Sequence, residues 1–292
     1  MRVHTRPHPR PTTLRRPVRL KLRPARLLVY LILVGFSGFY LLPIYLLVLT
    51  SLKSFSEISL SRMWDWPTSL SFDSFSSAWN LLNQSFLNSF ELVIPATIIS
   101  CALGSMNGYV LAKWKFPGSN TVFGIILFGM FIPYQSILIP LVKFLQSINL
   151  YGSISGLILV HVVYGIPITT LIFRNYYGGI PTELLEAGKI DGAGFFEVYR
   201  HIILPLSIPG FVVVAIWQLT SIWNEFLFAL VITNSPEQRP VTVALKNIAG
   251  SQYTQWNVQM AGALLVAIPT LVIYVFLGRY FLRGLLAGSV KG

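Results

Sequence analysis

The stretch PTELLEAGKIDGAGFFEVYRHIILP occupies residues 181–205, between two long apolar runs of the chain. Pro181 suits the first position of a helix, where the missing N–H is not needed, so a short helix is predicted over Thr182–Ile190. Two glycines then interrupt the pattern, and a second short helix is predicted over Phe195–Leu204, ending at Pro205. The stretch therefore predicts a helix–turn–helix with apolar and charged faces, lying outside the membrane.

The loop that contains this stretch spans residues 174–207. It is about thirty residues long, whereas a simple connection between two helices needs about two to eight. Glu183 and Glu186 lie near the positive N-terminal end of the first predicted helix, where acidic side chains are stabilising. A loop of this length with helices of its own is a candidate docking element for a partner.

The rest of the chain is too apolar for a water-soluble protein. Of its 292 residues, 54% are hydrophobic and 11% are charged, whereas soluble domains carry about 25% charged residues. The net charge of +12 does not indicate nucleic-acid binding, because nine of the 22 Lys and Arg residues precede the first apolar run. Residues 1–26 are instead expected to form a disordered, basic cytoplasmic arm near anionic lipid.

Six apolar runs are each long enough to cross a bilayer as a helix, which takes about 20 residues. They occupy Leu27–Leu49, Phe86–Ala112, Thr121–Leu141, Gly156–Phe173, Ile208–Val231 and Met260–Phe276. The first is too long for a signal-peptide core and is expected to be retained. We therefore predict an all-α, polytopic membrane protein with six transmembrane helices in one domain, residues 27–282, followed by a cytoplasmic tail, residues 283–292.

The basic residues are divided unequally between the two sets of loops. Seventeen of the 22 Lys and Arg residues lie in the N-terminal arm, the loops after the second and fourth runs, and the tail; five lie in the alternate loops. The positive-inside rule therefore predicts that both termini and the loop 174–207 are cytoplasmic. The segment between the fifth and sixth runs then faces outward.

The loop also carries a pattern of letters with a specific spacing. Glu186–Gly192, followed after nine residues by Ile202–Pro205, resembles the EAA motif of binding-protein-dependent ABC importer permeases. Only Gly188 departs from it, because it stands where alanine is usual. Trp223–Leu227 looks like a segment of carbohydrate-uptake permeases, and the ending Gly284–Gly292 is similar to the tail of the smaller maltose permease subunit.

The resemblance implies that the first short helix is a coupling helix seated in a cleft of a cytoplasmic ATPase. The implied ATPase-coupling residues are Glu183, Glu186, Ala187, Gly188, Asp191, Gly192, Leu204 and Pro205. It further implies a contact with an extracytoplasmic sugar-binding protein through Asn247, Gly250, Ser251 and Gln252.

The implied assembly contains a second homologous permease subunit, two copies of the ATPase and the sugar-binding protein, in membrane lipid. ATP and Mg would bind to the ATPase subunits, with no cofactor on this chain. The implied function is ATP-driven import of a mono- or oligosaccharide across the cytoplasmic membrane by alternating access. Two short segments, Arg174–Tyr177 after the fourth run and Gly278–Phe281 after the sixth, resemble glucose/mannose-type relatives, which favours a sugar of that type.

Two places within the apolar runs carry polar side chains suited to a translocation path. Tyr134 and Gln135 interrupt the third run between two prolines, and a broken helix there could line a cavity. Asn224 and Glu225 lie within the fifth run. An acid inside a span is costly and is by default a functional hypothesis. The alternative is that Glu225 makes an inter-helix hydrogen bond that fixes packing.

Other classes of function leave weaker signals. The chain has no G-x-x-x-x-G-K-[ST] loop and no H-E-x-x-H, so no catalysis is expected on it. A proton-coupled secondary transporter is the alternative, although it would place more titratable groups at mid-membrane. His161 is interpreted as a packing residue. Gly104-x-x-x-Gly108 is interpreted as a signal for close helix packing.

Overall fold

The computed structural model describes residues 24–114, 116–250 and 255–289, and all regular structure in these ranges is helical. The chain divides into two units at Tyr45, and each is described by itself. The first unit contains the greater part of α1 (Pro24–Ser51), an apolar helix long enough to cross a membrane. The second unit contains the last turns of α1 and all remaining helices.

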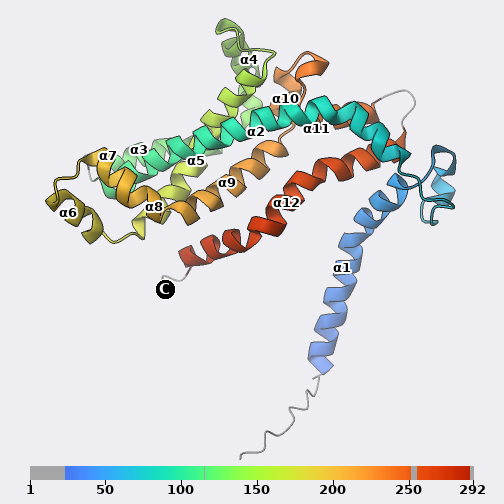
Figure 1. Cartoon of the computed structure of the whole chain (residues 1–292), viewed down its shortest axis with the longest axis horizontal. Helices are drawn as coiled ribbons and strands as arrows, with labels where there is room; N and C mark the ends of the chain where they lie inside the picture. Colours follow the sequence, from blue (N-terminus) through green and yellow to red (C-terminus); the bar gives the residue numbers. More distant parts are fainter. Residues whose placement is uncertain (1–23, 115, 251–254, 290–292) are drawn as a thin grey trace, which may run out of the picture. The chain divides into compact units, whose positions relative to one another are not determined.

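Two long helices, α2 (Asp73–Lys113) and α5 (Ile154–Gly178), lie side by side at the centre of the second unit (Figure 1). A Cβ atom added at Gly108 would lie 2.7 Å from Phe173 Cβ and 2.8 Å from the backbone nitrogen of Arg174. A Cβ at Gly104 would collide with Thr169. The close-packing interpretation of these two glycines is therefore confirmed, because only glycine lets the helices approach this closely.

Two further helices, α9 (Ile208–Trp223) and α12 (Trp256–Ser289), pack against α2. The indole nitrogen of Trp223 donates to the carbonyl of Val266 at 3.1 Å, which joins α9 to α12 inside the apolar core. Burying an indole N–H requires such a partner.

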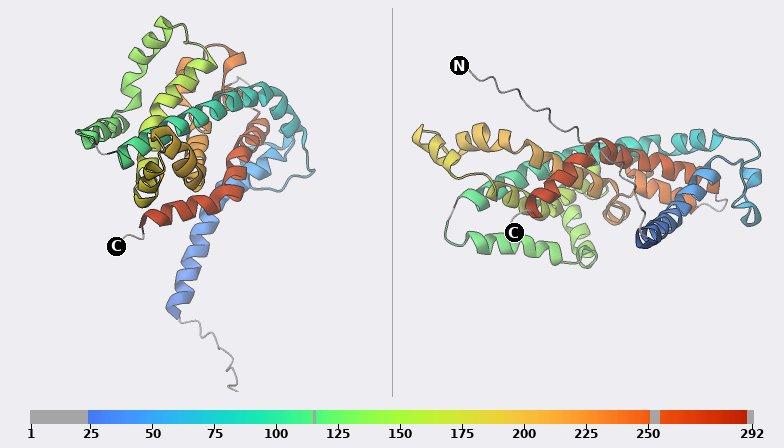
Figure 2. Two further views of the ribbon diagram at one scale, coloured as in Figure 1. Left: turned by 60° about the vertical axis from the view of Figure 1, so that its left-hand side comes forward. Right: turned by 90° about the horizontal axis from the view of Figure 1, so that it is seen from below.

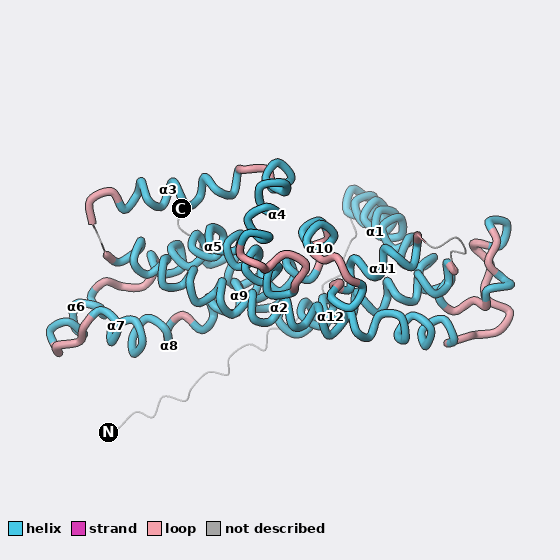
Figure 3. The backbone as a smooth tube through the Cα atoms, turned by 90° about the horizontal axis from the view of Figure 1, so that it is seen from above, coloured by secondary structure: helices cyan, strands magenta, loops and turns pink. Residues whose placement is uncertain are grey.

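The third apolar run is a bent pair rather than a single rod. It consists of α3 (Ser119–Phe128), η3 (Gly129–Phe131), η4 (Tyr134–Ile137) and α4 (Leu138–Ser147). The two halves meet at 87° (Figure 3). The break falls at Pro133, which cannot donate a backbone hydrogen bond and disfavours helical backbone in the residue before it.

The fifth apolar run is also interrupted, which corrects the expectation of a continuous helix over Ile208–Val231. Helix α9 ends at Trp223, and α10 (Leu227–Ile232) begins after a three-residue break. In the described part of the chain, four helices are long and apolar enough to span a membrane. The number is six if each of two bent pairs, 119–147 and 195–223, counts as one span.

The loop 174–207 contains α6 (Glu183–Ile190), α7 (Phe195–Val198), a π-helical segment η5 (Tyr199–Ile203) and α8 (Leu204–Leu206). The helix–turn–helix is confirmed, although the second helix runs past Pro205 instead of ending there. The π-helical segment leads directly into α8, where Pro205 occupies a first-turn position at which its missing N–H costs nothing. Figure 2 shows this loop projecting from the ends of α2 and α5.

The connections before α2 and before α12 are short helices. Two 3-10 turns, η1 (Phe55–Glu57) and η2 (Leu60–Arg62), precede α2, whereas η6 (Pro236–Gln238) and α11 (Val241–Ala249) precede α12. Within the second unit, residues 53–72 and the loop 174–207 lie at opposite ends (Figure 1). This placement is what the predicted topology requires of two loops on opposite sides of a membrane.

Candidate functional site

Helix α6 has one face packed against the loop and one face free in the described structure. Leu185 and Gly188 are buried, whereas Glu183, Glu186 and Ala187 are exposed. The exposed face also carries apolar side chains, because Leu184 is 43% and Ile190 86% exposed. We call the exposed side chains of residues 183, 184, 186, 187 and 190 the docking face.

The turn after α6 depends on a glycine. Gly192 has φ of 87°, in the left-handed region. Its backbone N–H donates to the carbonyl of Lys189 at 3.1 Å, and the N–H of Ala193 donates to the carbonyl of Gly188 at 2.9 Å. This is the Schellman pattern that closes a helix C-terminus, with Asp191 as the C-cap. Glycine suits position 192 because the backbone there has a positive φ, which residues with a Cβ rarely adopt.

Gly188, the one departure from the EAA pattern, lies under the second helix of the loop. A Cβ atom at this position would lie 2.7 Å from Ile202 Cδ1 and 3.5 Å from Val198 Cγ2. Because Gly188 has no methyl group, Ile202 can pack directly against it. The alanine usual at this position of the motif would collide with Ile202. Leu204 and Pro205, the last residues of the motif, are both exposed at the start of α8.

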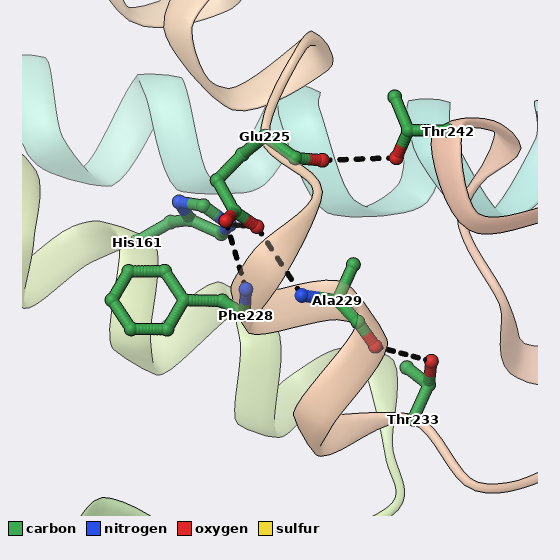
Figure 4. Close-up of polar contacts among 6 residues, drawn as sticks. All are labelled: His161, Glu225, Phe228, Ala229, Thr233 and Thr242. Atoms are coloured by element: carbon green, nitrogen blue, oxygen red, sulfur yellow. Dashed lines mark hydrogen bonds and ion pairs between the residues drawn. The ribbon is translucent and has the colours of Figure 1, made fainter. Parts of the chain in front are cut away.

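The break between α9 and α10 is organised by Glu225. Its carboxylate accepts the backbone N–H of Phe228 at 2.8 Å and that of Ala229 at 3.2 Å (Figure 4). The hydroxyl of Thr242 donates to the backbone carbonyl of Glu225 at 2.9 Å, which ties the break to α11. Glu225 thus satisfies N–H groups that a helix start leaves unpaired. This is a local bond within the broken span rather than the inter-helix bond considered as its alternative role.

His161 faces Glu225 from α5, a contact that the sequence did not reveal. Its Nε2 lies 3.8 Å from Glu225 Oε2, and the residue is 6% exposed. The imidazole ring also meets the ring of Phe228 edge-on, with centroids 5.8 Å apart. Figure 4 shows the imidazole beside the carboxylate. The only signal for this pair in the sequence was a histidine inside an apolar run.

The other residues predicted for the translocation path lie around this break. Tyr134, in η4, packs its ring 5.2 Å from the ring of Phe228, so the breaks of the third and fifth runs are adjacent. Asn224 is exposed, and its side-chain amide donates to the carbonyl of Thr220 at 2.8 Å. Gln135 is exposed beside Tyr134.

The segment predicted to meet a binding protein is partly described. Asn247 is exposed on α11 and, with Arg239 and Ser85, lines a cleft of about 490 Å³. Gly250 is exposed at the C-cap of α11. Ser251 and Gln252 lie outside the described residues.

The charges near this cleft are paired locally. Hydrogen bonds from its own backbone N–H and from the Ser235 hydroxyl, together with the nearby Arg239 guanidinium, lower the pKa of the Glu237 carboxyl. Glu237 is therefore an ionised surface acid at neutral pH.

An apolar bundle with broken helices and a helical loop at one end is the architecture of a membrane transport subunit. Residues 84–286 match the family described as "Binding-protein-dependent transport system inner membrane component", and the chain belongs to this family. It is accordingly a multi-pass protein of the cytoplasmic membrane. Its relatives are ABC transporter permeases, which are transport components rather than enzymes.

Three relatives cover almost the whole chain. A probable ABC transporter permease protein of Pyrococcus horikoshii is 47% identical, covering 93% of this chain and 99% of that protein. A xylose/arabinose import permease protein of Haloferax volcanii is 36% identical over 89% of this chain and 92% of its own. A glucose import system permease protein of Saccharolobus solfataricus is 32% identical over 93% and 99%, respectively.

The fold is shared with a solved structure. A chain of a bacterial ABC transporter involved in the import of the acidic polysaccharide alginate superposes with a TM-score of 0.78 at 21% identity, covering 91% of this chain and 100% of that one. A second structure, of the alginate transporter in complex with an alginate pentasaccharide-bound periplasmic protein, gives 0.65 at 15% identity and covers 87% and 93%. These likenesses show that the chain has the ABC importer permease fold.

Proposed function

We propose that this chain is one membrane subunit of an ATP-driven importer that moves a sugar into the cell by alternating access. It works beside a second homologous permease subunit in the bilayer, with two copies of a cytoplasmic ATPase and an extracytoplasmic sugar-binding protein. Several relatives are named for sugars, among them xylose/arabinose, glucose and arabinooligosaccharides, which supports this class of substrate. Within it we favour a glucose/mannose-type sugar.

The observation that carries the proposal is the docking face of α6. Glu186 and Glu183 are exposed beside Ile190, which is 86% exposed although it is apolar. A free apolar and acidic helix face at the end of a membrane bundle suits a cleft with a basic rim on a soluble partner. ATP and Mg bind on that ATPase partner, and this chain contributes the coupling residues from Glu183 to Pro205.

The same proposal assigns the translocation path to the two helix breaks. Tyr134, Gln135 and Asn224 are exposed there and offer an aromatic ring and amide groups, which are chemically suited to sugars. Glu225 has a different part, because both its carboxylate oxygens bind backbone N–H groups of α10. It holds the break in shape, whereas Tyr134, Gln135 and Asn224 line the path.

We assign the contact with the sugar-binding protein to the outer end of the bundle, at the end of α11. Asn247 and Gly250 are exposed at the end of α11, and the cleft beside them carries Arg239. A concave surface that combines apolar side chains with Arg239 and Asn247 suits a protein partner.

The proposal is tested with the assembled transporter in proteoliposomes. Glu186→Lys replaces an attraction with a repulsion, and loss of one partner of a desolvated charge contact costs about 2–5 kcal/mol. We expect at least about tenfold weaker retention of the ATPase subunits and a matching loss of uptake. Glu237→Lys makes the same charge change at the outer end and should retain the ATPase normally. Wild-type retention and uptake in Glu186→Lys would contradict the proposal.

A further inference from the structure

The docking loop is joined to the helix bundle by three hydroxyl groups. Ser105 Oγ, on α2, lies 2.5 Å from Tyr177 Oη, on α5, and 2.7 Å from Tyr199 Oη, on η5. Ser105 and Tyr177 are completely buried, each with 0% exposure. A serine hydroxyl has one proton to donate and can also accept, so Ser105 can bond both tyrosines at once. We call these three residues the hydroxyl cluster.

The π-helical segment places Tyr199 in this cluster. Its wider turn extends over Tyr199–Ile203, and the N–H of Leu204 closes it by donating to the Tyr199 carbonyl. Such segments are rare in helices and are frequently found at functional sites. The Tyr199 ring packs 5.3 Å from the ring of Tyr109 on α2, and Tyr109 in turn packs 5.0 Å from Phe195. The second loop helix is therefore held on α2 by tilted ring contacts as well as by the hydroxyl cluster.

The docking helix is attached to this same segment. Gly188 of α6 lies against Ile202 and Val198, and the backbone bond from Ala193 to the Gly188 carbonyl fixes the turn between the helices. A displacement of α6 therefore carries η5 with it, because these contacts are close-packed and leave little room for independent motion. The contacts run without a gap from the docking face to α2 and α5.

We propose that the Ser105–Tyr177–Tyr199 hydroxyl cluster is the joint through which movement of the docking loop is transmitted to the α2–α5 pair. This inference rests on the proposed function, since it assumes that the loop is the ATPase-coupling element. Directional hydrogen bonds between buried groups resist displacement more strongly than sliding apolar contacts do. Ser105, Tyr177 and Tyr199 are thus positioning residues that act on the transport cycle through the helices they connect.

The test is the number of sugar molecules transported per ATP hydrolysed by the full complex in proteoliposomes. Tyr199→Phe keeps the ring contact with Tyr109 and removes only the hydroxyl. We expect this ratio to fall about fivefold, the factor that corresponds to the loss of one net hydrogen bond. ATPase retention should be unchanged, because the docking face is untouched. Tyr151→Phe, which removes a hydroxyl that donates to the Val231 carbonyl at 3.3 Å near the outer end, should keep the wild-type ratio.

A double-variant cycle separates the joint from a general structural role. Ser105→Ala combined with Tyr199→Phe should lower the ratio no further than Ser105→Ala does alone, because both changes remove the same bond. If the two substitutions lower the ratio additively, or if Tyr199→Phe keeps the wild-type ratio, the hydroxyl cluster is not the joint. If Glu186→Lys still releases the ATPase in that case, the proposed function stands and only this inference fails. Wild-type ATPase retention and uptake in Glu186→Lys, together with a wild-type ratio in Tyr199→Phe, would instead contradict the proposed function.

Discussion

Replacing Gly192 with alanine tests whether the turn after α6 must keep its left-handed backbone for docking. The residue has φ of 87°. A side chain with a Cβ pays about 1–2 kcal/mol to adopt left-handed helical backbone. Nothing lies within 4 Å of a Cβ added at this position, so the cost comes from the backbone alone and not from a clash. The magnitude can therefore be estimated without a packing contribution.

If that cost falls on the docked conformation, the affinity of the ATPase for the chain should decrease about 5- to 30-fold. Asparagine visits the left-handed region more readily than other residues that carry a Cβ, so Gly192→Asn should lose less affinity than Gly192→Ala. Valine is β-branched and disfavours positive φ most strongly, so Gly192→Val should lose more. The expected order of affinity is glycine, asparagine, alanine and valine.

The assay is retention of the ATPase by the purified complex at a series of protein concentrations, with sugar uptake measured in parallel. Gly178→Ala is the matched control, because Gly178 is a helical glycine at the cytoplasmic end of α5 with open space around an added Cβ and no positive φ. It should bind the ATPase like the wild type. Equal affinities for the wild type, Gly192→Ala and Gly192→Val would refute the reasoning, and so would an equal loss in Gly178→Ala.

Two further predictions concern the break and the topology. Glu225→Gln keeps one acceptor oxygen of the two that bind α10, at a cost of about 0.5–1.5 kcal/mol, so it should retain substantial uptake in proteoliposomes, whereas Glu225→Ala should lose more. Complete loss of uptake in the glutamine variant with normal assembly would point to an acid-specific role, as in a proton-coupled transporter. Single cysteines at Ser69 and Arg200, both exposed, in a Cys101→Ala background should report the orientation. An impermeant thiol reagent added outside should label position 69 and spare position 200; the reverse pattern would contradict the predicted topology.

Signals that act over a few residues were readable in the sequence. Gly192 ends α6 through its positive φ, whereas Pro181 lies two residues before the first helical residue, Glu183, and not at the first helical position predicted for it. The spacing of Gly104 and Gly108 predicted close packing, because residues four apart lie on one face of a helix. What this spacing left open was the partner, which the structure identifies as α5.

The break at Glu225 could be predicted only in part from such local signals. The acid marked a special position in the fifth run, yet apolar periodicity alone predicted one continuous helix. The helix ends at Trp223 because the carboxylate binds the first N–H groups of α10, which makes a new helix start at the break. A capping interaction of this kind, made by a glutamate within an apolar run, has no strong sequence signature.

The sequence by itself determined the class of protein: apolar runs of membrane-crossing length, the uneven division of basic residues, and a spaced motif in one loop are all one-dimensional properties. Only the tertiary structure decided which side chains meet. His161 faces Glu225, and Ser105 contacts both Tyr177 and Tyr199, because α2, α5, α9 and the docking loop pack with particular rotations and registers. Those rotations depend on the summed packing of residues far apart in the chain, so no local pattern records them.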